Sequence, residues 1–256
     1  METIRQSDLN AMKDCSEVIE KLQDEDRSVV REAALLAGEY YCISAVPHLT
    51  QLLQSSNLGI QEAAELALRK IGGRDTVQAV IPLLSSEDVP VRNLAIDILR
   101  QVGNQDLDTL LDLLFEQDPD IRIFAADILG SAGNVTAVRP LCEVLLNDPE
   151  VNVRYQAAVS LGELRNNEAT RCLNQAFGDD EWVQFAVVEA LIKIRDESCL
   201  GALIKAIGQG SELVDSMIFE ALGEMGNVKA VPMLLSKPHD APPPLPNTIV
   251  QPAGNP

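Results

Sequence analysis

The stretch that decides the fold is Asp118-Pro119-Asp120-Ile121-Arg122, which leads to Ala125-Ala126, Leu129-Gly130 and Gly133. Its core is an aliphatic residue, often followed by Arg, with a small or apolar residue four positions after the aliphatic one. This phrase recurs along the chain, with the aliphatic residue at Val30, Ile60, Val91, Ile121, Val153, Val183 and Val214. Successive copies are 30, 31, 30, 32, 30 and 31 residues apart, and such regular spacing predicts a repeat protein.

Each copy of the phrase predicts the start of an amphipathic helix. In the third copy the apolar positions are Val91, Ala95, Ile98, Leu99 and Val102, which is helical spacing and not strand alternation. Asp118-Pro119 and Asp148-Pro149 combine an N-cap acid with Pro in the first turn. A shorter, Leu-rich helix precedes each copy, so the predicted unit is a helix pair, A then B.

Helix pairs that cannot bury their apolar faces alone must stack on their neighbours. We therefore predict an all-α protein, a right-handed α-solenoid of about seven stacked helix pairs, with a period of about 31 residues. The expected organisation is a capping segment (1–13), seven repeats (14–228), an incomplete eighth repeat (229–237) and a Pro-rich extended or disordered tail (238–256). Whether the tail is a ligand or a linker, and whether the native array continues beyond residue 237, stay open.

Composition excludes several classes of function. The 256 residues carry a formal net charge of −19, which argues against binding to nucleic acids or to anionic membranes. Only two histidines are present, His48 and His239, and no Gly-rich phosphate loop or Ser-His-Asp arrangement is recognisable. We expect no metal, no cofactor and no catalytic residue.

The cysteines and the N-terminus bear on the compartment. Five scattered cysteines without C-x-x-C spacing are interpreted as free, small, buried hydrophobes. The first residues have no apolar segment of the kind found in secretory signals, and no stretch reaches the length of a membrane-spanning helix. A cytoplasmic protein is expected.

The unit around Asp118-Pro119 and the one that runs from Asp148-Pro149-Glu150 to Val153-Arg154, Ala157-Ala158 and Leu161-Gly162 resemble bacterial HEAT repeats of the phycobilin-lyase-like type. In HEAT proteins the repeated Arg commonly pairs with an acid of a turn and forms a ladder along the stack. The resemblance thus implies a structural role for four arginines, Arg31, Arg92, Arg122 and Arg154. Gln61, Gln184 and Asp215 interrupt this ladder.

Enzymes with HEAT-like folds provide tests by residue type. Deoxyhypusine hydroxylase holds iron through His-Glu pairs, whereas here His48 precedes Leu49 and His239 precedes Asp240. Alkylpurine glycosylases of this fold need a basic concave surface, which the net charge opposes. Phycobilin lyases have no well-defined sequence motif by which they could be excluded. Tyr155, Trp182 and Phe185 could contribute to a groove for a tetrapyrrole.

Two positions of each B helix should share its outer face, namely those two and six residues after the aliphatic residue. They place Ile123, Tyr155 and Phe185 beside four acids, Asp97, Asp127, Glu189 and Glu220. An exposed apolar patch bordered by charge is typical of a partner site, although these side chains could instead pack on the adjacent B helix.

The sequence therefore predicts a non-catalytic interaction module or scaffold. It would bind a basic or basic and apolar peptide, helix or protein along an acidic ridge of B helices. The alternative is a phycobilin lyase subunit, or a chaperone for the chromophore or its apoprotein.

Overall fold

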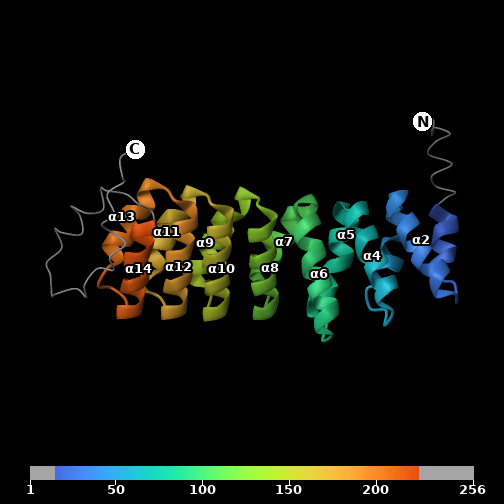
Figure 1. Cartoon of the computed structure of the whole chain (residues 1–256), viewed down its shortest axis with the longest axis horizontal. Coiled ribbons are helices and arrows are strands. Elements are labelled where there is room, and N and C mark those ends of the chain that lie inside the picture. Colours follow the sequence, from blue (N-terminus) through green and yellow to red (C-terminus); the bar gives the residue numbers. More distant parts are fainter. Residues whose placement is uncertain (1–14, 225–256) are drawn as a thin grey trace, which may run out of the picture. The chain divides into compact units, whose positions relative to one another are not determined.

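The computed structural model describes residues 15–224, in which helices and turns occur and strands do not. The chain divides into two compact units between Leu113 and Leu114. Each unit is a run of stacked A and B helices, so the protein is an all-α solenoid, as the repeat predicts (Figure 1). The predicted capping segment, incomplete eighth repeat and Pro-rich tail lie outside the described residues.

The first unit begins with a helical segment at residues 15–21, and 3-10 helices extend several of its A helices. Its B helices pack on one another in sequence order, and its A helices do the same. The elements are α2 (Arg27–Glu39), η1 (Ile43–Ala45), α3 (Val46–Leu52), α4 (Leu58–Ile71), α5 (Gly73–Val80), η2 (Ile81–Ser85), α6 (Val89–Val102), η3 (Gly103–Asp106) and α7 (Leu107–Asp112).

The second unit repeats this arrangement. The B helices α8, α10, α12 and α14 lie side by side, and α11 packs between the A helices α9 and α13 (Figure 1). The elements are η4 (Leu113–Phe115, across the boundary), α8 (Pro119–Ala132), η5 (Val135–Ala137), α9 (Val138–Asn147), α10 (Val151–Leu164), η6 (Asn167–Ala169), α11 (Thr170–Gln175), η7 (Ala176–Gly178), α12 (Glu181–Ile194), α13 (Glu197–Ala206) and α14 (Glu212–Glu224).

One of the two predicted helix starts is displaced. Asp118 is the N-cap of α8, and its carboxylate accepts a hydrogen bond from the Asp120 N–H. Asp148 does not cap α10, which begins at Val151 with Glu150 as its N-cap. Asp148 accepts from the Glu150 N–H instead and directs both carboxylate oxygens to the neighbouring repeat.

The expectation that all cysteines are free is wrong. Cys15 pairs with Cys42 and Cys142 with Cys172, while Cys199 is free and buried. The paired residues are 27 and 30 positions apart, about one repeat, so stacking brings each pair to a Cα–Cα distance of 5.6 Å. That distance lies in the usual range for a disulfide. The two bonds therefore join neighbouring repeats.

Glycines allow the B helices of the second unit to cross closely. A Cβ atom on Gly130 would lie 2.7 Å from the Cβ of Ser160, and one on Gly162 would lie 2.8 Å from the Cα of Ala190. Real Cβ atoms do not approach other heavy atoms so closely, so a side chain at either glycine would push two B helices apart.

Gly162→Leu is expected to lower the free energy of unfolding by about 1–3 kcal/mol, because the larger side chain overpacks the α10–α12 crossing. Gly201→Leu is the matched control, since a Cβ on that helical glycine meets nothing within 4 Å. Urea titrations followed by circular dichroism measure both. Equal stabilities of the two variants would contradict the close crossing.

Candidate partner-binding surface

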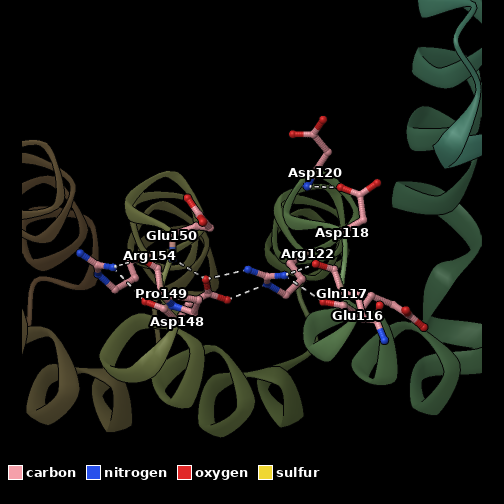
Figure 2. A network of polar contacts seen from close by, with 9 residues as sticks. All are labelled: Glu116, Gln117, Asp118, Asp120, Arg122, Asp148, Pro149, Glu150 and Arg154. Carbon is pink, nitrogen blue, oxygen red and sulfur yellow. Dashed lines mark hydrogen bonds and ion pairs between the residues drawn. The ribbon is translucent and has the colours of Figure 1, made fainter.

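In most repeats, the residue that follows the repeated aliphatic position of the B helix bonds to the turn that precedes that helix. Arg122 donates from Nη1 to the carbonyls of Glu116 and Gln117, and Arg154 donates in the same way to Asp148 and Pro149 (Figure 2). These bonds satisfy carbonyl groups that the turn itself leaves without helical partners.

The same two arginines also reach the next repeat. Arg122 makes a two-pronged ion pair with Asp148, with Nε–Oδ2 and Nη2–Oδ1 distances of 2.7 and 2.9 Å (Figure 2). Arg154 pairs with Asp179 in the same geometry, at 2.7 Å for both contacts. Asp148 thus links the two arginines, since its carboxylate pairs with Arg122 and its backbone carbonyl accepts a hydrogen bond from Arg154.

Three repeats have another residue in place of this Arg, and that residue still bonds to the turn before its B helix. Gln61 donates to the Leu53 carbonyl and Gln184 to the Asp179 carbonyl. Asp215 accepts from the Gly208 N–H, which reverses the direction of the bond. The sequence predicted interruptions at these three positions. The structure shows that the bond to the turn persists there without the arginine-to-acid pair.

The two remaining arginines of the predicted ladder lie in the first unit. Arg92 donates to the Ser86 carbonyl, which is the bond to its own turn. Arg31 is exposed, and its side chain lies beside Gly59.

The ion pairs shift the pKa values of their members. The hydrogen bond to Asp148 raises the pKa of Arg122 above its usual value against the opposing effect of burial, and Asp179 does the same for Arg154. Burial alone would raise the pKa of Asp179. The hydrogen bonds from Arg154 and from the Asp180 N–H outweigh it, so this pKa lies below its ordinary value.

The lowered pKa of Asp179 predicts a pH-dependent contribution to stability. The ionised carboxylate stabilises the folded state fully above the unfolded-state pKa of about 3.9, and this contribution disappears as the pH falls through the lower folded-state pKa. Asp179→Asn should therefore be less stable than the parent protein at pH 7, and the difference should shrink below about pH 4. Urea titrations of both proteins at several pH values measure this, and a difference that does not change with pH would contradict it.

The predicted apolar residues of the outer face differ in exposure. Tyr155 on α10 is 37% exposed, whereas Ile123 on α8 and Phe185 on α12 are half-buried. The Phe185 ring packs edge-to-face on Trp182, with ring centroids 5.6 Å apart. The structure thus brings Phe185 into contact with an aromatic residue that the outer-face positions had not included.

The predicted acids are distributed over both units. Asp97 lies on α6 of the first unit, where it is exposed and pairs with Arg100. Asp127 on α8 is half-buried, and Glu189 on α12 and Glu220 on α14 are exposed. Three of the four acids are therefore on B helices of the second unit, the unit that carries Tyr155 and Phe185.

Trp182 and Leu213 are exposed apolar residues that the two outer-face positions miss. They precede the aliphatic residues Val183 and Val214, and they are 65% and 57% exposed. Trp182 and Leu213 occupy equivalent positions near the beginning of the neighbouring helices α12 and α14. The signal was available in the sequence, because this position changes from Asp120 and Asn152 to Trp182 and Leu213 in the last two repeats.

Exposed acids surround the beginnings of these helices. Asp180 caps α12, Glu181 lies in its first turn, and Glu212 lies in the first turn of α14. We call Tyr155, Trp182, Phe185 and Leu213 the apolar strip, and these three acids its rim.

Two further observations bear on other kinds of site. Residues 15–224 hold no group of three or more His, Cys, Asp or Glu side chains placed to bind a metal ion. In the same range no helix is both long and apolar enough to cross a membrane.

The amino-acid sequence matches a known family along nearly the whole chain. Matches to HEAT repeats cover residues 15–100, 46–115, 107–191 and 173–244. The chain belongs to the HEAT-repeat family. A comparison with curated proteins finds no match.

Several solved structures are similar to this HEAT-repeat protein. Importin beta is 13% identical, with a TM-score of 0.52 over 87% of this chain and 36% of that one. Human deoxyhypusine hydroxylase is 19% identical, with a TM-score of 0.43 over 88% of this chain and 91% of that one. The complex of CpcE and CpcF of phycocyanin lyase from Nostoc is 20% identical, with a TM-score of 0.37 over 87% and 94%. At these identities the likeness concerns the fold alone.

Proposed function

We propose that this HEAT-repeat protein is a non-catalytic interaction module that binds a partner on the B helices of its second unit. The observation that carries the proposal is the apolar strip, where three neighbouring helices expose Tyr155, Trp182 and Leu213. Water-exposed aromatic side chains on a rigid scaffold are typical of the anchors that dominate protein interfaces, often about 2 kcal/mol or more each.

The charge around the strip favours a basic partner. The rim acids and Glu189 and Glu220 are exposed, and the chain as a whole is strongly acidic. A partner helix or peptide with one apolar face and flanking Lys or Arg would bury the strip and face the acids. The acids would mainly speed association, and this effect is expected to weaken as salt screens them.

The single tryptophan provides the test. Binding of an amphipathic Leu/Lys peptide to the strip should shift the emission of Trp182 to shorter wavelength, because the indole leaves water. Tyr155→Ala with Leu213→Ala keeps this reporter and should weaken binding tenfold or more, which corresponds to about 1.4 kcal/mol. Leu58→Ala is the control, since Leu58 is also exposed but lies on α4 of the first unit.

Equal affinity of the double variant and the control would contradict the proposed surface. The alternative function, a phycobilin lyase subunit or chromophore chaperone, predicts another result. A bilin added to the pure protein would then acquire an induced circular-dichroism signal in the visible range, and Tyr155→Ala would reduce it.

A cytoplasmic location is part of the proposal. Cytosolic thiols are kept reduced, so both cysteine pairs would be dithiols in the cell and would oxidise to the disulfides outside it. Rapid acid quenching of cells followed by alkylation should then label five cysteines. A single labelled cysteine would instead place the protein in an oxidising compartment.

A further inference from the structure

The A helices of the second unit leave two neighbouring grooves that the proposed function does not use. One lies between α9 and α11, has a volume of about 310 Å³ and is lined by residues that include Arg139, Glu168 and Arg171. The other lies between α11 and α13 and has a volume of about 450 Å³. Arg171 and Glu168 line both, and Lys205 lines the second.

The repeat explains why the second groove is open. Leu141, Leu173 and Leu203 are fully buried at equivalent places in α9, α11 and α13. Two residues earlier the three helices carry Arg139, Arg171 and Gly201. A Cβ on Gly201 would meet nothing within 4 Å, so the missing side chain leaves space beside Arg171.

The grooves are basic in a chain that is otherwise acidic. Arg139, Arg171 and Lys205 are exposed, and their side chains make no ion pair within residues 15–224. Three other basic residues of this unit are engaged, since Arg122 and Arg154 hold turn acids and Lys193 pairs with Glu163. Arg165 and Arg195 are exposed at the C-terminal ends of α10 and α12 and line neither groove. Glu168 is the one acid among the lining residues, and Asp196 accepts hydrogen bonds from the lining residue Ser198. The three cations outnumber these two acids, so the grooves carry a net positive charge.

We propose that the two grooves bind an acidic, extended segment of a partner protein. Packed helices are about 8–10 Å apart, and a polyproline-type chain advances about 9 Å in three residues. An acid at every third residue would therefore meet Arg139 and Arg171 on successive helices. The backbone of such a chain makes no hydrogen bonds of its own, and the side-chain amide of Asn174 lines the groove, where it can donate to the carbonyls of the bound chain.

Other anionic ligands fit this surface less well. The net charge of −19 opposes a long polyanion such as a nucleic acid. A single phosphate needs converging donors, whereas Arg139 and Lys205 line different grooves. The grooves lie on A helices and the apolar strip on B helices, so this proposal stands independently of the proposed function.

The test measures the anisotropy of a fluorescein-labelled peptide of five Glu-Pro-Pro units with the full chain. Arg139→Gln with Arg171→Gln should weaken binding at least tenfold. Arg27→Gln with Arg74→Gln changes the net charge equally in the first unit and should have little effect. Gly201→Met should also weaken binding by filling the groove, with unchanged helicity.

Three results would overturn the proposal. One is equal affinity for a Gln-Pro-Pro peptide, and another is an equal loss in the two double variants. The third is displacement of the peptide by inorganic phosphate but not by chloride at the same ionic strength, which would indicate a small-anion site.

Discussion

Replacement of Arg122 by Met is expected to lower the free energy of unfolding by about 3–5 kcal/mol, because it leaves the Asp148 carboxylate buried without a counter-charge. The side chains of Arg122 and Asp148 are only 9% and 6% exposed. The substitution also removes the donor to the turn carbonyls of Glu116 and Gln117. Urea titration followed by circular dichroism measures the loss.

Two control substitutions separate the loss of the ion pair from other effects of Arg122→Met. Arg100→Met removes an exposed pair with Asp97 and should cost less than about 1 kcal/mol. Asp148→Asn removes the charge but keeps an oxygen for the Glu150 N–H. Adding it to Arg122→Met should recover part of the loss, because no buried charge then remains. A loss of unfolding free energy in Arg122→Met no larger than that in Arg100→Met would contradict the structural role of the Arg122–Asp148 pair.

Reduction of the two disulfides is expected to destabilise the oxidised protein by about 2–4 kcal/mol for each bond, because each closes a loop of roughly one repeat in the unfolded chain. Oxidised protein should contain one free thiol, that of Cys199. Urea midpoints measured with and without a reductant give the size of the effect. Cys142→Ala with Cys172→Ala should remove the part that belongs to the second unit.

Cys15→Ala with Cys42→Ala gives the corresponding part for the first unit. Additive losses are expected, since the two bonds lie in different units. Unchanged midpoints in the parent protein upon reduction would show that the bonds carry no stability.

The disulfide pairs could have been predicted from the repeat spacing but not from the composition. Taken singly, five scattered cysteines have no recognisable motif. Measured against the repeat, Cys142 and Cys172 lie 30 positions apart on consecutive A helices, which stack directly. The separation that defines the repeat was therefore the signal for the bond.

The candidate surface shows a different limit. Helical spacing assigns Ile123, Tyr155 and Phe185 to one face, but only Tyr155 among them is exposed. Ile123 and Phe185 are half-buried, and Phe185 packs on Trp182. Helical spacing within one helix contains no information about how the next helix packs against it. Trp182 and Leu213 are exposed in the first turns of α12 and α14, one residue before the buried Val183 and Val214.

The sequence by itself determined the helix pairs, their period and the all-α solenoid, because helical spacing and capping act within about 31 residues and recur in every copy. The tertiary structure alone decided which repeated side chains are partners. Asp148 does not cap α10 but pairs with Arg122, and Gln184 makes only the hydrogen bond to the Asp179 carbonyl of its turn. The physical reason is that stacking brings residues one repeat apart into contact, so burial and pairing depend on the neighbouring repeat as much as on the residue itself.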